Sequence, residues 1–460
     1  MSNQNEQSSH WINQEMMSLD LGDRRLEERA RQIISDFSQH PNGSIPEFSG
    51  DWARTRAVYQ FMRNPQAEPK QLLAAQRQAT LKRIGLLPLV LIVQDTTSFN
   101  FIHHPGTSGL GPLENKKCNG FLAHSSLAVT PEGVPLGLLA QQSWVRDENE
   151  VGQRHQRQQR PIEAKESYKW LQGLTESTHQ WPAEVRGLVV SDQESDIFEY
   201  FVHPRPASID LLLRACQERR LEAEVKNLGP AVRTSPVRGK VSVQVGRRGQ
   251  QAARLAECQV QFKRVKLRPP KNRPAHLPKL KAVVLWAILI REVQPPEQLE
   301  PLEWFLLTTR QVSSFEQACQ LIQYYTRRWL IERFHFVLKS GCALEQRQLA
   351  DGQRLLRLLA IANVVAWRLL WQTYLGRLDQ NLPCTTVLAD YEWKALYSFI
   401  HKTALLPEAV PSLAQTIRWI AQLGGFLARK SDGYPGVKVL WRGWRRLFDI
   451  TETWLIFNTS

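Results

Sequence analysis

The sequence is poor in cysteine, and its six cysteines are scattered along 460 residues. No two of them form a Cys-x-x-Cys pair, so we expect neither a zinc site nor a disulfide framework, and the thiols are predicted to be reduced. Long apolar runs are also lacking: the longest stretch, residues 355–371, is interrupted by Arg357 and Arg368, whereas a membrane span needs ~20 apolar residues. The polar N-terminus has no apolar signal-peptide core. These absences predict a cytoplasmic protein without a membrane partner.

The sequence has fewer acidic than basic residues. It contains 44 Asp and Glu but 59 Lys and Arg, which gives a formal net charge of +15. The excess is concentrated between Arg214 and Lys281, where 18 basic residues stand against 4 Glu and no Asp. Such an excess favours a polyanionic partner, of which nucleic acid is the commonest. A basic surface that only keeps the protein soluble is the alternative.

The pattern of apolar residues predicts an α/β fold with helical regions at both ends. Residues 1–70 and 351–460 have helical periodicity. Three apolar runs between them are typical of central strands buried on both faces, and they read LLPLVLIV, VRGLVVS and IDLLLRA. Residues 216–300 alternate polar and apolar positions, which indicates a basic, β-rich insertion. A further strand, LEWFLLTT, then precedes one long helix over residues 315–341.

Two aspartates follow apolar strands that lie far apart in the sequence. Asp95 comes after the first run and Asp192 after the second, and Glu332 lies on the long helix. Mg²⁺ prefers a few carboxylates, waters and phosphate oxygens, and two such ions ~4 Å apart can promote phosphodiester chemistry. The alternative for each aspartate is an ordinary loop or cap residue.

The long helix places an acid, two bases and a phenol on one stripe. Tyr325, Arg328, Glu332 and Lys339 fall within an arc of about 60° at helical spacing. One interpretation is a metal-binding Glu332 flanked by groups that contact DNA phosphates. The other is a solvated face on which Glu332 pairs with Arg328.

The segment YYTRRWLIERFHFVLKSG resembles the Y-(2)-R-(3)-E-(6)-K signature of DDE transposases in the insertion-sequence-four group, and the pattern is similar to that of the Tn-five type. VQDTTS and VSDQESDI resemble the family's two Asp segments, and the likeness covers nearly the whole chain. It implies a ribonuclease-H-like catalytic core over residues 71–215 and 301–350, interrupted by the insertion at 216–300. It also implies a DNA-binding region at 1–70 and a dimerisation region at 351–460.

The resemblance assigns catalysis and metal binding to Asp95, Asp192 and Glu332, which would hold two Mg²⁺ ions; Mn²⁺ can substitute. The second Asp segment departs from the family pattern, because Gln193 stands where the family usually has Arg. This departure concerns DNA contacts and leaves the metal triad intact.

The resemblance also assigns contacts with the transposon end. Tyr325, Arg328 and Lys339 are expected to contact DNA, Trp304 matches a tryptophan that handles a flipped base, and Arg214 matches a basic residue nearby.

Two further DNA contacts are predicted from the residues alone. Arg24 and Arg25 could place charge on one side of an N-terminal helix that reads bases, although a solvated face explains them equally well.

These assignments predict a cut-and-paste transposase that cleaves a transposon end, forms a hairpin and transfers the strand into target DNA. Its partners would be double-stranded DNA, both terminal inverted repeats and target, and a second copy of the chain in a synaptic homodimer. The protein would therefore be associated with the nucleoid. The rivals are a non-catalytic transposition inhibitor that binds DNA and a structure-specific nuclease.

Overall fold

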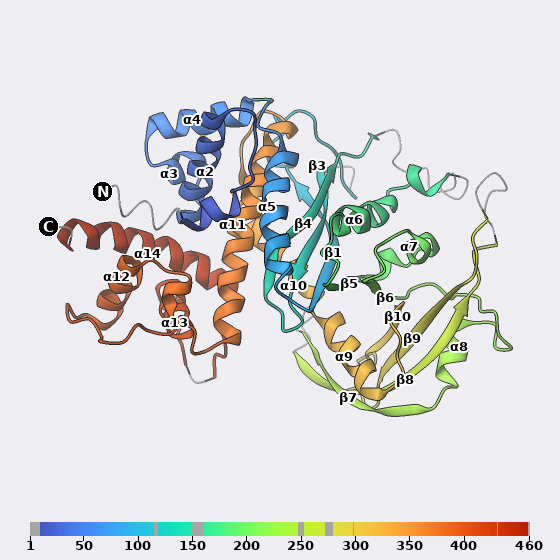
Figure 1. Ribbon diagram of the computed structural model, residues 1–460. Helices are drawn as coiled ribbons and strands as arrows, with labels where there is room; N and C mark the ends of the chain where they lie inside the picture. Colours follow the sequence, from blue (N-terminus) through green and yellow to red (C-terminus); the bar gives the residue numbers. More distant parts are fainter. Residues whose placement is uncertain are drawn as a thin grey trace.

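The computed structural model describes residues 10–114, 118–148, 160–246, 253–271, 279–297, 299–429 and 431–458. A large mixed sheet fills one side of the molecule and two groups of helices fill the other, with the long helix α11 (Gly352–Leu378) between them (Figure 1). The α/β fold with helical ends is therefore confirmed, and the arrangement is consistent with a ribonuclease-H-like core.

The sheet has ten strands in the order β2-β3-β1-β5-β6-β10-β9-β8-β7, with β4 paired to β3. β1, β5 and β6 are parallel, and the other pairs are antiparallel. The strands are β1 (Leu89–Asn100), β2 (Gly111–Pro112), β3 (Asn119–Val129), β4 (Pro135–Trp144), β5 (Arg186–Ser191), β6 (Ile209–Arg214), β7 (Val237–Val245), β8 (Arg254–Leu267), β9 (Val283–Glu292) and β10 (Glu303–Thr308).

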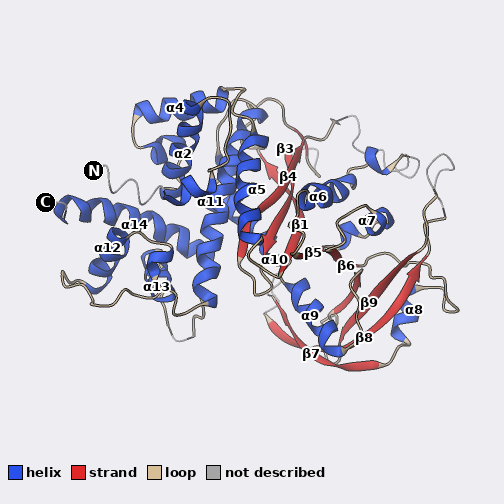
Figure 2. Cartoon of the chain, in the orientation of Figure 1, coloured by secondary structure: helices blue, strands red, loops and turns tan. Residues whose placement is uncertain are grey.

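The helices cover both faces of the sheet and form the two ends of the chain (Figure 2). They are α2 (Arg24–Gln39), α3 (Ile45–Ser49), α4 (Trp52–Arg63), α5 (Pro69–Ile84), α6 (Tyr168–Thr178), α7 (Phe198–Val202), α8 (Leu228–Arg233), α9 (Phe315–Thr326), α10 (Trp329–Phe336), α11, α12 (Asp390–His401), α13 (Leu413–Leu423) and α14 (Val437–Asn458). Short helical turns lie at Ile162–Ala164, Gln193–Ser195, Val337–Gly341, Leu344–Gln346 and Cys384–Thr386.

The central strand β1 separates two apolar cores. Leu91 and Val93 pack with α10 on one face, while Val90 and Ile92 pack with α6 on the other. The expectation of strands buried on both faces is thus confirmed for this strand. The predicted strand segment, LLPLVLIVQDTTSF, ends at Phe99, one residue before the end of β1 at Asn100. The placing of Asp95 at the end of the strand was wrong, because β1 continues past Asp95 in antiparallel pairing with β3.

The helix α11 is long and apolar enough to cross a membrane by length and composition alone. However, 83% of its most apolar window is buried inside the fold. It packs against α2, α5, β4 and α14, so it serves as the core helix that joins the sheet to both helical ends.

The predicted single helix over residues 315–341 is wrong. It is divided into α9 and α10, because the N–H groups of Arg327 and Arg328 bond to the carbonyls three residues earlier and tighten the chain into a turn. A π-helical turn follows at Val337–Gly341. Tyr325 therefore lies on α9, Arg328 in the turn, Glu332 on α10 and Lys339 on the π-helical turn.

The insertion is β-rich, as expected, but it does not form a sheet of its own. β9 pairs with β10 along six residues, so β7, β8 and β9 continue the central sheet. Part of its basic charge is neutralised internally: Lys240 pairs with Glu257, and Arg254 pairs with Glu292.

Candidate active site

Asp95 lies in the middle of β1 on the face that α10 covers. Its side chain is only 18% exposed. Burial raises the pKa of this carboxyl from 3.8 to about 7; the Arg328 guanidinium opposes that rise, whereas the charges of Asp192 and Glu332 add to it. The carboxylate therefore lies in a buried, acidic environment that favours a cation.

Asp192 stands directly after β5, the parallel neighbour of β1. The two strands pair with Val93 opposite Val190, so continuation of this register brings Asp192 level with Asp95. Its carboxylate accepts the N–H of Glu194 at 2.8 Å and caps a short helical turn. Burial raises its pKa as well.

Glu332 approaches from α10, and its side chain is 53% exposed. One guanidinium joins it to Asp95: Arg328 lies 3.6 Å from the Asp95 carboxylate and also hydrogen-bonds to the Glu332 carboxylate. The pairing of Glu332 with Arg328, one of the two sequence interpretations, is therefore observed, whereas metal binding by Glu332 stays a prediction.

The carboxylates of Asp95, Asp192 and Glu332 are suitable ligands for a divalent metal, but their side chains are not arranged around a common ion position. Three carboxylates are the oxygen ligands that Mg²⁺ or Mn²⁺ prefers, and their mutual repulsion contributes to the raised pKa of Asp95. Within the described residues, however, no group of three acidic, histidine or cysteine side chains is arranged to hold an ion. The side chain that bridges two of these carboxylates is Arg328.

A groove beside the carboxylates contains most of the predicted DNA contacts. It lies between β7, β10 and the helices α9 and α10. The predicted residues on its wall are Arg214, Trp304, Tyr325, Arg328 and Glu332. The rings of Trp304 and Tyr325 meet edge to face, with centroids 5.3 Å apart. Burial raises the pKa of Tyr325, so its phenol remains a hydrogen-bond donor.

Lys339 is not part of this groove wall. It lies on the π-helical turn, with its ammonium 5.7 Å from the centre of the Phe99 ring and 3.9 Å from the Glu345 carboxylate. Phe99 follows Asp95 by four residues on the same face of β1, so Lys339 stands further along that strand.

The N-terminal region exposes basic side chains on more than one helix. Arg24 is exposed, but it pairs with Glu28 along its own helix. By contrast, α4 exposes a stripe whose members recur at helical spacing, and Trp52 within it is 78% exposed. The members of this α4 stripe are Trp52, Arg56, Gln60 and Arg63. Sequence reasoning missed it, although the i, i+4, i+8, i+11 spacing of aromatic, cationic and amide side chains was visible.

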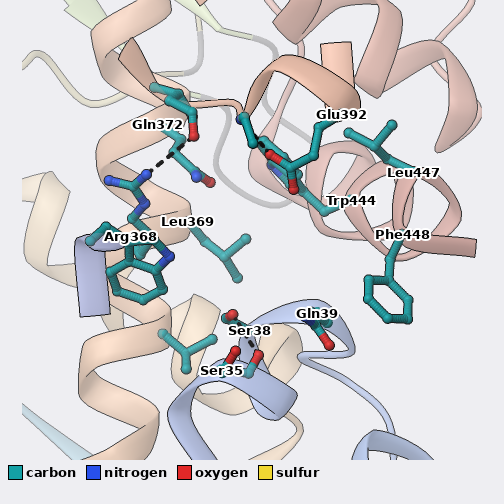
Figure 3. Close-up of a pocket in the computed structure, with 14 residues that line it drawn as sticks. Ser35, Ser38, Gln39, Arg368, Leu369, Gln372, Glu392, Trp444, Leu447 and Phe448 are labelled. Atoms are coloured by element: carbon teal, nitrogen blue, oxygen red, sulfur yellow. Dashed lines mark hydrogen bonds between the residues drawn. The ribbon is translucent and has the colours of Figure 1, made fainter. Parts of the chain in front are cut away.

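A separate small cavity lies far from this chemistry in the fold. It is enclosed by α2, α11, α12 and α14 and includes Arg368, Gln372 and Glu392 (Figure 3). The Arg368 guanidinium lies over the rings of Trp11 and Trp371 and donates to the carbonyl of Val387. The cavity contains none of the three carboxylates.

Two family models match the chain. The first, described as Transposase DNA-binding, matches residues 8–67. The second, described as Transposase Tn5 dimerisation domain, matches residues 364–453. Together they support a Tn5-like transposase, a nucleotidyl-transferase-type enzyme that depends on divalent metal in general. They also confirm the predictions of DNA binding and of a homodimer. Neither match includes the carboxylates.

Proposed function

We propose that this chain is a cut-and-paste DNA transposase of the insertion-sequence-four group, with Asp95, Asp192 and Glu332 as its metal ligands. One observation carries the proposal: the Arg328 guanidinium is paired with both Asp95 and Glu332. Carboxylates separated by more than 200 residues thus share one cation. The β1–β5 register, continued two residues beyond Val190, supports Asp192 as the third ligand.

Each region of the chain is proposed to have its own function. We assign recognition of the inverted repeats to residues 1–70 through the α4 stripe, and catalysis to 71–215 and 301–350. The basic insertion at 216–300 would follow the DNA backbone, and residues 351–460 would form the dimer contact. Transposition of this kind takes place on chromosomal DNA, which places the protein in the cytoplasm at the nucleoid.

The groove residues would handle the DNA end. Two Mg²⁺ ions held by the triad would activate the attacking oxygen and stabilise the leaving one. Arg214 and Arg328 would contact phosphates, which positions the strand without reading its sequence. Trp304 and Tyr325 offer aromatic surface for an unstacked base, and such a base accompanies hairpin formation. Lys339 would bind a phosphate further along β1.

The test uses DNA ends taken from the inverted repeats that border the gene. Asp95→Asn, Asp192→Asn and Glu332→Gln should each abolish Mg²⁺-dependent cleavage and strand transfer in a gel assay, while end binding persists. Glu303→Gln is the matched control, because this carboxylate is adjacent to Trp304 but pairs with Arg233; it should cleave normally.

Two outcomes would contradict the proposal. Full cleavage by any triad variant removes that residue from the site. Cleavage by the wild-type protein without joining of the 3′ end to target DNA would identify a nuclease instead.

A further inference from the structure

A line of mostly buried polar side chains runs from α11 across β4 and β3 to α10, along one face of the sheet. The Asn363 side-chain amide donates to Gln141 at 2.8 Å, and Gln141 donates to the Ser125 hydroxyl at 3.0 Å. Ser125 in turn lies 3.2 Å from Nε2 of His335. Ser125, His335 and Asn363 are all buried. Four elements, α11, β4, β3 and α10, thus contribute one member each.

The hydrogen bonds of this line have a consistent direction. Burial lowers the pKa of His335 to about 3, so its ring is neutral and one nitrogen accepts. Because Gln141 already donates to the Ser125 oxygen, the hydroxyl proton is available for His335 Nε2. A second bond from Gln141 to the Asn363 carbonyl, at 3.2 Å, completes an amide pair. Buried networks that are satisfied in this way fix one packing arrangement.

Two neighbouring members of the line, Ser125 and His335, lie next to the proposed metal ligands. Ser125 is the direct partner of Asp95 in the antiparallel β1–β3 ladder. His335 follows Glu332 by three residues, about one turn along α10. The Ser125–His335 contact therefore fixes the helix that carries Glu332 to the strand opposite Asp95.

We propose that His335 and Ser125 are positioning residues that set α10 so that Glu332 reaches Asp95. The inference rests on the proposed function, because Glu332 and Asp95 are taken there as metal ligands. Asn363 and Gln141 extend the connection to α11, which is held by the core on several sides.

The same strands carry a matched control on their opposite face. Tyr200 donates to Gln94 at 2.9 Å, and Gln94 donates to Ser126 at 3.1 Å. Gln94 and Ser126 are each one residue away from Asp95 and Ser125, but they face α6 and α7. Tyr200→Phe removes a buried hydrogen bond of the same kind without touching α10.

The experiment compares His335→Leu, His335→Gln and Tyr200→Phe with wild type in the full-length protein. Three quantities are measured: end binding, Mn²⁺ affinity without DNA, and the cleavage rate at saturating DNA and metal. Support for oriented metal ligands is typically worth about 10–100-fold in metal affinity or activity. We expect His335→Leu to lose roughly this factor in Mn²⁺ affinity or cleavage, with end binding within about twofold.

The glutamine variant distinguishes positioning from simple stability. His335→Gln can accept from Ser125, so it should recover most of the lost activity, and Tyr200→Phe should cleave like wild type even where its melting temperature falls. Wild-type Mn²⁺ affinity and cleavage in His335→Leu would overturn the proposal. The proposal would also be overturned if His335→Leu and Tyr200→Phe both lost Mn²⁺ affinity or cleavage in proportion to their loss of melting temperature. If the wild-type protein does not cleave, the proposed function fails. The Mn²⁺ affinity of His335→Leu then tests the positioning role alone, and a wild-type value in that case would refute it.

Discussion

Neutralising Asp95 should stabilise the metal-free protein while it destroys cleavage. The folded pKa of this carboxyl is raised from 3.8 to about 7, so folding favours its protonated form. The stabilising contribution of that proton is complete below the unfolded pKa and is lost as pH rises through about 7. Above that pH the folded protein bears the full cost of a buried carboxylate, which Asp95→Asn removes.

The size of the stability gain expected for Asp95→Asn follows from the raised pKa of Asp95. About three pKa units correspond to about 4 kcal/mol at 1.36 kcal/mol per unit, as an order of magnitude for a side chain that is 18% exposed. Part of this cost is already present at pH 5, because that pH lies above the unfolded pKa. Between pH 5 and pH 8 the advantage of Asp95→Asn over wild type should therefore grow by about 2–3 kcal/mol.

The assay is a series of melting curves from pH 5 to pH 8 in a chelating buffer, repeated with saturating Mg²⁺. Because the chain has several regions, apparent melting temperatures are compared between variants and not converted into absolute free energies. Mg²⁺ should reverse the order at pH 8, since only the wild type gains full binding energy. An advantage that does not grow with pH, or a less stable Asp95→Asn at pH 8, would refute the reasoning.

Asp196→Asn is the matched control for that series. This buried carboxylate pairs with Arg219 and accepts the N–H groups of Cys216 and Gln217 at 2.8 Å each. Its substitution leaves a partly buried guanidinium without its charge partner, so it should destabilise the protein. Opposite signs for the two variants at pH 8 would separate the metal ligand from the structural carboxylate.

Two further predictions concern the cations. Arg328→Ala should tighten Mn²⁺ binding severalfold in the absence of DNA, on the order of the ~1 kcal/mol of a partly exposed ion pair, while it weakens end binding; unchanged Mn²⁺ affinity by calorimetry would show that Arg328 does not compete at Asp95. On α4, Trp52→Ala and Arg56→Ala should each weaken end binding by about 1–3 kcal/mol, whereas Arg24→Ala should change it little. If Arg24→Ala weakened end binding more than the α4 variants in gel-shift titrations, DNA reading would be assigned to α2 instead of α4.

The strands and their carboxylates could be predicted because their signals are local. An apolar run followed by Asp identifies both Asp95 and Asp192, and the buried sheet leaves few other arrangements for such runs. The structure links Asp95 to Glu332 through the Arg328 guanidinium, whereas the metal-binding role of the three carboxylates stays a prediction. What could not be predicted is that Asp95 lies within β1 and not at its end, because the polar half of this strand is stabilised by its pairing with β3.

The helix that carries Glu332 shows a different limit of sequence reasoning. Periodicity over residues 315–341 is nearly continuous, yet the chain turns at Arg327 and Arg328. The turn depends on tertiary contacts: Arg327 donates to the carbonyl of Pro131 in the β3–β4 hairpin, and Arg328 faces Asp95. Helical spacing therefore grouped Lys339 with Tyr325, although the structure separates them.

The groove is formed jointly by strands of the proposed catalytic core and by strands of the insertion. β10 pairs with β6 on one side and with β9 on the other, so Trp304 stands where the proposed catalytic sheet passes into the insertion. β7 supplies the opposite wall with Val241, Ser242, Val243 and Gln244. An insertion that folded apart from the core would leave Trp304 and Tyr325 on an open edge. Its strands instead extend the sheet, and this extension creates a groove that reaches Glu332, which no local pattern in the insertion could reveal.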